Sequence, residues 1–311
     1  MPLNEQSRAL LESIKAAGQP PAFLVSLKEA RQRMETTYAK SPEVSVGQVW
    51  EETIPCPRGG IRMRIYRPKQ EKKAYPAVVF IHGGGWTFDS VETHDTAVRL
   101  LCRESGCMFL SVDYRMAPEH KFPEPLEDVY TAVQWTFDNI ERLGGARDRI
   151  AICGDSAGGN LAAAVCLLAR DRGSFTLKYQ YLIYPALQDG YVGSEAYELY
   201  GKDYYLTRDM VIWTMQNYLR YDEDRKNPYV FPLCAKSLAQ LPPAHIVTAQ
   251  YDPLHDDGVS YASRLRKAGV SVTYRDYPGL MHGFINYWFC IDEAMDALRE
   301  LGGIIQTTME A

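Results

Sequence analysis

A serine with a glycine two residues away on either side is the first feature of this sequence that could do chemistry. Gly154, Ser156 and Gly158 follow an apolar run at 150–153, and a helical pattern begins at residue 157. A tight strand-to-helix turn of this kind favours small flanking residues and presents the serine hydroxyl above the sheet. The helix also points unpaired N–H groups at that hydroxyl. The pattern therefore predicts a nucleophile at Ser156, with an ordinary structural turn as the alternative.

A glycine-rich stretch, His-Gly-Gly-Gly-Trp at 82–86, directly follows another apolar run at 77–81. Acyl transfer needs N–H donors where the carbonyl oxygen becomes negative. We expect Gly83 and Gly84 to supply two such donors and the N–H of Ala157 a third. A phosphate loop is disfavoured, because the sequence has neither Gly-x-x-x-x-Gly-Lys-Ser/Thr nor Gly-x-Gly-x-x-Gly opening a helix.

A base must activate the serine, because a free hydroxyl is a weak nucleophile. Three of the six histidines lie beyond Ser156, where the acid and then the base follow this kind of turn in chain order. His245 falls inside an apolar strand pattern, and His255 falls in a charged helix start. His282 lies between glycines in a loop after a strand, which suits a presented imidazole. We therefore predict His282 as the base.

The acid that orients the imidazole should lie on a loop at the same end of the sheet. Asp252 closely follows the strand pattern at 244–248 and precedes Pro253. Asp256 and Asp257 come later and favour the start of the next helix by charge. Asp252 would hold the imidazole tautomer and stabilise the imidazolium. Spacing favours Asp252 but leaves Asp256 open.

Two residues beside these motifs, Trp86 and Asp155, are candidates for the substrate pocket. The aromatic side chain of Trp86 suggests an apolar wall, while Asp155 adjoins the nucleophile. The sequence has no His-Glu-x-x-His and no close set of histidines and carboxylates, so it predicts no metal site. It also predicts no cofactor.

Charge and composition limit the partners. The chain has 34 basic and 39 acidic residues, a net charge of −5, which argues against nucleic-acid binding and offers no polybasic patch for anionic lipid. Its longest apolar stretches, 161–168 and 77–81, are too short to span a membrane. Seven scattered cysteines indicate reduced thiols, mostly buried, and hence a cytoplasmic location.

The elements that must position these residues alternate along the chain. Short apolar runs predict strands buried on both faces, and the segments between them show helical spacing. Strands are expected at 77–81, 108–112, 150–153, 180–183, 244–248 and 271–276, and helices at 126–143, 157–169, 257–268 and 287–305. The fold class is therefore α/β, a mostly parallel sheet with helices on each side. Alternating residues in 44–67 predict antiparallel edge strands.

The chain divides into a catalytic domain and a helical cap. Residues 44–186 and 231–311 carry the strands of the catalytic domain. Residues 187–230 form a tyrosine-rich insertion, which we interpret as a lid with a helix around 207–220. Residues 1–43 contain helices that complete this cap.

Five motifs in order resemble one family. They are HGGGW at 82–86, DYRMAPEH at 113–120, GDSAGGN at 154–160, YDPL at 251–254 and HGF at 282–284. Together they resemble the hormone-sensitive-lipase-like (family IV) bacterial esterases of the α/β-hydrolase fold. The resemblance implies a triad of Ser156, Asp252 and His282, which favours Asp252 over Asp256. It also implies an oxyanion hole of Gly83, Gly84 and Ala157.

The same resemblance implies what the protein acts on. Family members mainly hydrolyse small-molecule, short-chain acyl esters without a cofactor, which suggests acetyl to about hexanoyl esters here, and many of them form homodimers. Amide deacylation and acyl transfer need the same residues and remain alternatives. A non-catalytic receptor, like the related plant gibberellin receptor, is disfavoured because His282 is present.

Overall fold

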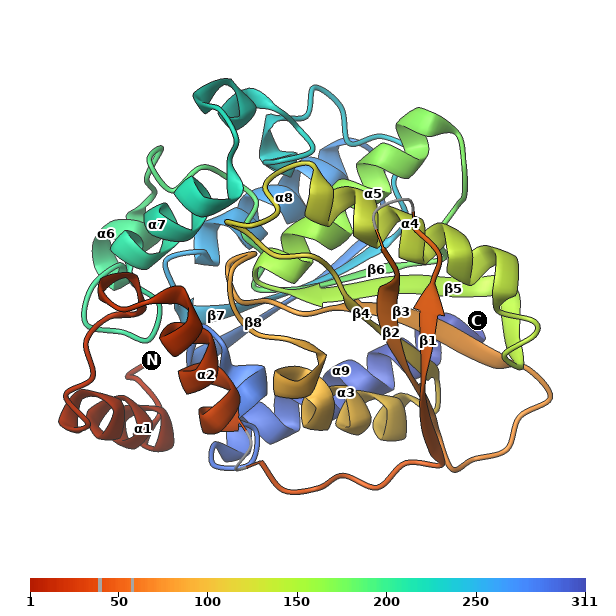
Figure 1. The fold of residues 1–311 in the computed structure, drawn as a ribbon, viewed down its shortest axis with the longest axis horizontal. Helices are drawn as coiled ribbons and strands as arrows, with labels where there is room; N and C mark the ends of the chain where they lie inside the picture. The colour runs from red at the N-terminus through yellow and green to blue at the C-terminus, as the bar shows by residue number, and fades with distance from the viewer. Residues whose placement is uncertain (39–40, 57–58) are drawn as a thin grey trace.

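The computed structural model describes residues 1–38, 41–56 and 59–311. Within them an eight-stranded sheet forms the centre of the molecule, in the order β1-β2-β4-β3-β5-β6-β7-β8 (Figure 1). The strands are β1 (Gln48–Ile54), β2 (Ile61–Arg67), β3 (Tyr75–Ile81), β4 (Met108–Asp113), β5 (Gly145–Asp155), β6 (Gln180–Ile183), β7 (Ala244–Tyr251) and β8 (Val272–Met281). β1 and β2 pair antiparallel, as do β2 and β4, and the other pairs are parallel. The predicted fold class is confirmed.

Continuous apolar strands arise because both faces of the sheet are covered. Along β3, Ala77 and Val79 pack into one hydrophobic core, while Val78 and Phe80 pack into another. Successive side chains of a strand point to opposite faces, so a strand between two cores must be apolar at every position. Burial on both faces thereby holds in place the strands at whose carboxyl ends the site residues lie.

Helices cover both faces of the sheet. They are α1 (Glu5–Ala16), α2 (Leu27–Tyr38), α3 (Val91–Ser105), α4 (Glu124–Asn139), α5 (Ala157–Arg172), α6 (Glu195–Tyr200), α7 (Arg208–Tyr218), α8 (His255–Lys267) and α9 (Asp292–Glu310). α3 and α9 pack together on one face, and α4, α5 and α8 lie on the other (Figure 1). The last helix begins five residues later than predicted, because a 3₁₀ turn occupies Phe284–Tyr287. The helix α3 was not among those predicted.

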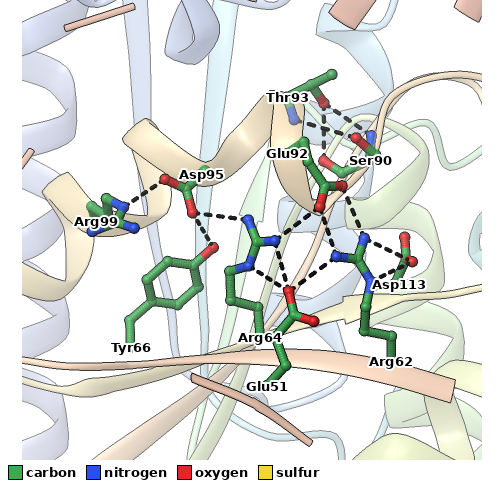
Figure 2. A network of polar contacts seen from close by, with 10 residues as sticks. All are labelled: Glu51, Arg62, Arg64, Tyr66, Ser90, Glu92, Thr93, Asp95, Arg99 and Asp113. Carbon is green, nitrogen blue, oxygen red and sulfur yellow. Dashed lines mark hydrogen bonds and ion pairs between the residues drawn. The ribbon is translucent and has the colours of Figure 1, made fainter. Parts of the chain in front are cut away.

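A network of charged side chains fixes the beginning of α3 against the edge strands. Ser90 and Thr93 cap each other's backbone, and Glu92 lies between Arg62 and Arg64 of β2 (Figure 2). Asp95, one turn along the helix, accepts a hydrogen bond from the hydroxyl of Tyr66 at 2.9 Å. Several charges in one network hold geometry better than an isolated surface pair. The loop that enters α3 is therefore fixed at its far end.

The N-terminal helices lie beside α6 and α7 at one end of the sheet, at the left of Figure 1. Arg31 of α2 joins them to the catalytic domain. Its guanidinium donates to the carbonyl oxygens of Thr87 and Ala117 and pairs with Glu119 at 2.8 Å. α2 is thus tied directly to the loops that follow β3 and β4.

The seven cysteines are free thiols. Four of them are buried, Cys56 is half-buried, and Cys234 and Cys290 are exposed, so a majority of the thiols is buried, as expected. In the part of the chain that the structure describes, no helix is both long and apolar enough to cross a bilayer.

Candidate active site

Ser156, His282 and Asp252 form a continuous hydrogen-bonded chain. Nε2 of His282 lies 2.9 Å from Oγ of Ser156, and Nδ1 of His282 lies 2.6 Å from Oδ2 of Asp252. The other carboxylate oxygen of Asp252 accepts the N–H of Leu254 at 2.8 Å. All three triad side chains are buried. This is the geometry in which an imidazole can take the serine proton while a carboxylate fixes its tautomer.

The three residues meet because each follows a strand of the parallel sheet. Ser156 follows β5, Asp252 follows β7 and His282 follows β8, and the carboxyl ends of parallel strands lie at one edge. Ser156 has a φ of 54°, a left-handed conformation that is strained for a serine. A Cβ at position 158 would overlap the carbonyl oxygen of Ile81, so only glycine fits there. The turn predicted around Ser156 is therefore present.

The neighbouring aspartates have other partners. Asp256 accepts the N–H of Ala196 in the cap, and Asp257 accepts the N–H groups of Leu187 and Gln188. Neither contacts His282. The geometry therefore places Asp252, and not Asp256, beside the imidazole.

The other two candidate histidines, His245 and His255, have environments that suit a structural role. His245 is buried, and burial lowers its pKa to about 4, so it stays neutral. His255 lies 3.0 Å from Asp256 and 3.4 Å from Asp276. The hydrogen bond that His255 donates to Asp276, aided by Asp256, raises the pKa of His255 to about 9. The ion pair of His255 is therefore structural.

Replacing His255 with asparagine should destabilise the protein in a pH-dependent way. A histidine whose pKa rises on folding stabilises the folded state. Its full contribution is present below the pKa of the unfolded chain, about 6.5, and disappears as the pH rises through about 9. We expect a loss of about 1–2 kcal/mol at pH 6.5, reduced for partial exposure, and almost none at pH 9.5. Urea unfolding of both proteins at the two pH values measures this. Equal destabilisation at both would contradict the assignment.

The glycine-rich loop differs from the prediction at one position. The N–H of Gly83 donates to Oδ1 of Asp155 at 2.9 Å, in a buried contact. A donor already bonded to a carboxylate is not available to a substrate oxyanion, so the expected role of Gly83 is wrong. Gly84 and Gly85, in contrast, border the cavity above Ser156. Sequence reasoning missed Gly85, because the direction of each N–H depends on backbone dihedrals.

Asp155 holds the glycine-rich loop through a hydrogen bond. Besides Gly83, its Oδ1 lies 3.2 Å from Nε2 of His94, which is fully buried at the start of α3. Burial lowers the pKa of His94, but the contact with Asp155 outweighs burial and raises it overall. Asp155 borders the cavity, as predicted for a pocket residue, yet its Oδ1 is committed to these two partners. Its place indicates a positioning role.

A cavity of about 750 Å³ opens above the triad. Ser156 and His282 lie in its wall, together with residues of the N-terminal helices, the glycine-rich loop and α7. Trp86, a predicted pocket residue, also lines it and stacks on Tyr218 of α7 with ring centroids 4.5 Å apart. The reacting side chains therefore follow strands of the sheet, while most of the wall comes from the N-terminal segment and α7.

The fold and this geometry define a serine hydrolase of the α/β class. Residues 78–286 match the family profile described as the alpha/beta hydrolase fold. Together with the curated relatives below, this match shows that the chain belongs to the hormone-sensitive-lipase-like family of α/β hydrolases. The resemblance inferred from the five motifs is confirmed.

Three relatives illustrate the likeness. The carboxylic ester hydrolase LipN of Mycobacterium tuberculosis is 43% identical over 79% of this chain and 66% of its own, just under two thirds of its length. The ethyl acetate hydrolase of Pseudomonas putida is 32% identical over 96% of both chains. The solved structure of a hyperthermophilic esterase from the archaeon Pyrobaculum calidifontis superposes with a TM-score of 0.94, at 40% identity and complete coverage of both chains.

Proposed function

We propose that the protein is a serine carboxylesterase that hydrolyses short-chain acyl esters through an acyl-serine intermediate. The observation that carries the proposal is the continuous contact from Asp252 through His282 to Ser156, at 2.6 and 2.9 Å. The relatives named as ester hydrolases support the same activity. A receptor without catalysis would not need this complete chain of contacts.

The first half of the reaction forms the acyl-enzyme. Oγ of Ser156 attacks the ester carbonyl as Nε2 of His282 takes its proton, and Asp252 stabilises the resulting imidazolium. His282 then gives the proton to the oxygen of the leaving alcohol. In the second half His282 activates water, which attacks the acyl-serine and releases the acid.

The oxyanion is held by the N–H groups of Gly84, Gly85 and Ala157. Ala157 is the first residue of α5, where an N–H has no partner within the helix. In the described part of the chain, the N–H groups of Gly84 and Gly85 have no hydrogen-bond acceptor. All three residues border the cavity at Ser156, so their free donors suit a developing negative charge.

The acyl-chain optimum tests the substrate class. We expect hydrolysis of p-nitrophenyl esters to peak between acetate and hexanoate and to fall toward palmitate. A matched butyryl anilide should react much more slowly, because its leaving group is poorer. Rates that rise steadily to palmitate would reject the short-chain proposal. Absence of hydrolysis, together with absence of labelling by a fluorophosphonate, would reject the esterase itself.

Homodimerisation and a cytoplasmic location stay predictions from the sequence. The oligomeric state can be read directly by light scattering on purified protein.

A further inference from the structure

Asp89 is a carboxylate on the wall of the catalytic cavity that neither the triad nor the oxyanion hole uses. It lies at the end of the glycine-rich loop, one residue before the cap of α3. Among the residues that the structure describes, its covered Oδ1 has no hydrogen-bond partner. A buried hydrogen-bond acceptor without a partner lowers the free energy of unfolding unless a bound group supplies a donor. The cavity is the place from which a donor can come.

The backbone holds this side chain in an uncommon conformation. Asp89 has a φ of 64°, a region that glycine occupies without strain and other residues rarely adopt. The next residue, Ser90, caps α3, which the charged network of Figure 2 fixes to β2. Asp89 is therefore held at the cavity wall by the anchored start of α3, at a position where glycine would fit more easily.

The groups around Asp89 favour a neutral donor over a cation. The charged or ionisable groups that act on it most strongly are His94, Asp155 and His282. Burial raises the pKa of Asp89 to about 6, although both histidines oppose this, so the group is mainly ionised at pH 8. The nearby His94 already balances part of the negative charge, because its own pKa is raised. A hydroxyl can satisfy the oxygen without adding a second positive charge.

A cluster of tyrosine hydroxyls lines the same cavity as Asp89. The tyrosine cluster consists of Tyr38, Tyr205 and Tyr287, all buried or half-buried and all lining the cavity. The hydroxyls of Tyr38 and Tyr205 are 2.8 Å apart. Burial raises the pKa of all three hydroxyls, and the negative charge of Asp89 contributes to each of these shifts. Hydroxyls both donate and accept, so this wall suits a ligand that carries a hydroxyl of its own.

The tyrosine cluster lies on the side of the catalytic histidine. The ring of Tyr205 packs against Gly283, next to His282, at a distance that leaves little room for a Cβ. His282 delivers its proton to the oxygen of the leaving alcohol, so the alcohol part of the ester must lie on that side. The cavity wall also contains Met210, Val211 and Met215 of α7, which are apolar.

We propose that Asp89 selects esters whose alcohol part carries a free hydroxyl, such as monoesters of glycols or glycerol, by accepting a hydrogen bond from that hydroxyl. The inference rests on the proposed esterase function. The selection concerns the alcohol part of the ester, while the acyl group would contact the apolar residues of α7. Asp89 is then a specificity-determining residue, distinct from the groups that perform the bond changes.

Two esters of equal size test the proposal. 2-Hydroxyethyl butyrate and propyl butyrate differ only by a terminal hydroxyl group in place of a methyl group. We expect the ratio of their kcat/KM values to be about tenfold or more higher in the wild type than in Asp89→Gly, the size of one hydrogen bond to a charged acceptor. Comparing this ratio between proteins cancels the intrinsic reactivity of the two esters. Hydrolysis is followed by pH-stat at pH 8.

Asp203→Gly is the matched control. Asp203 also has a positive φ, 66°, but its side chain is 87% exposed and it does not line the cavity. The ratio should keep its wild-type value in this variant. Thermal unfolding of both variants shows whether each is folded, and glycine relieves rather than adds strain at both positions.

Each outcome decides the question. A ratio that is the same in wild type and Asp89→Gly would overturn the proposal while leaving the esterase function intact. If butyrylcholine is preferred over its neutral isostere 3,3-dimethylbutyl butyrate, and Asp89→Gly removes that preference, the site takes a cation and the hydroxyl assignment is wrong. If the wild type hydrolyses none of these esters nor p-nitrophenyl butyrate, both the esterase function and this inference fail.

Discussion

Replacing Ser156 with alanine should lower kcat for p-nitrophenyl butyrate by roughly five to six orders of magnitude, as loss of the nucleophile does in a serine triad. The residual rate comes from the oxyanion donors and from binding, which the substitution leaves in place. The fold should persist, because alanine removes only the hydroxyl from a buried position.

The control for this variant is Ser111→Ala. Ser111 is another buried serine, on β4, and its hydroxyl has no partner among the described residues. Its removal should leave the rate unchanged. A fluorophosphonate should add its mass to the wild type and to Ser111→Ala, but not to Ser156→Ala. Wild-type turnover in clean Ser156→Ala protein would show that another residue is the nucleophile.

Replacing Asp252 with asparagine should lower kcat by about four orders of magnitude. The amide keeps the size of the side chain but can present an N–H toward Nδ1 of His282, which favours the tautomer that cannot accept the serine proton. Because Asp252 is fully buried, water does not replace the lost charge. The same p-nitrophenyl butyrate assay measures the loss.

Asp256→Asn and Asp257→Asn separate this effect from a general loss of carboxylate charge. Both residues bond backbone N–H groups in the segment 187–196, and neither contacts the imidazole. Their replacement should change thermal stability more than rate. If Asp256→Asn lost as much activity as Asp252→Asn, the chain of contacts to Ser156 would not describe the working enzyme.

The triad could be predicted because strand order and local sequence determine where it lies. Ser156, Asp252 and His282 each follow an apolar strand, and parallel strands bring their carboxyl ends to one edge whatever lies between them. Only one assignment, Asp252 over Asp256, needed the family resemblance. The structure shows why: Asp256 lies in the first turn of α8 and faces the cap.

The glycine loop and Asp89 could not be predicted in the same way. The direction of the N–H of Gly83 depends on a contact with Asp155, 72 residues away, which no local pattern records. The role proposed for Asp89 depends on the cavity wall around it, which comes from α2, α7 and the loop after β8. For α3 a signal was present, since Ser90 and Thr93 form a capping pair before an amphipathic run.

The contacts of Arg31 have a consequence for how such proteins can be recombined. One guanidinium joins α2, which forms part of the outer wall of the cavity, to carbonyl oxygens of two loops and to Glu119. The position of α2 therefore depends on the loops that follow β3 and β4. A chimera could take residues 1–38 from one family member and the remainder from another. It would keep α2 in place only if the residues at positions 31 and 119 could still pair.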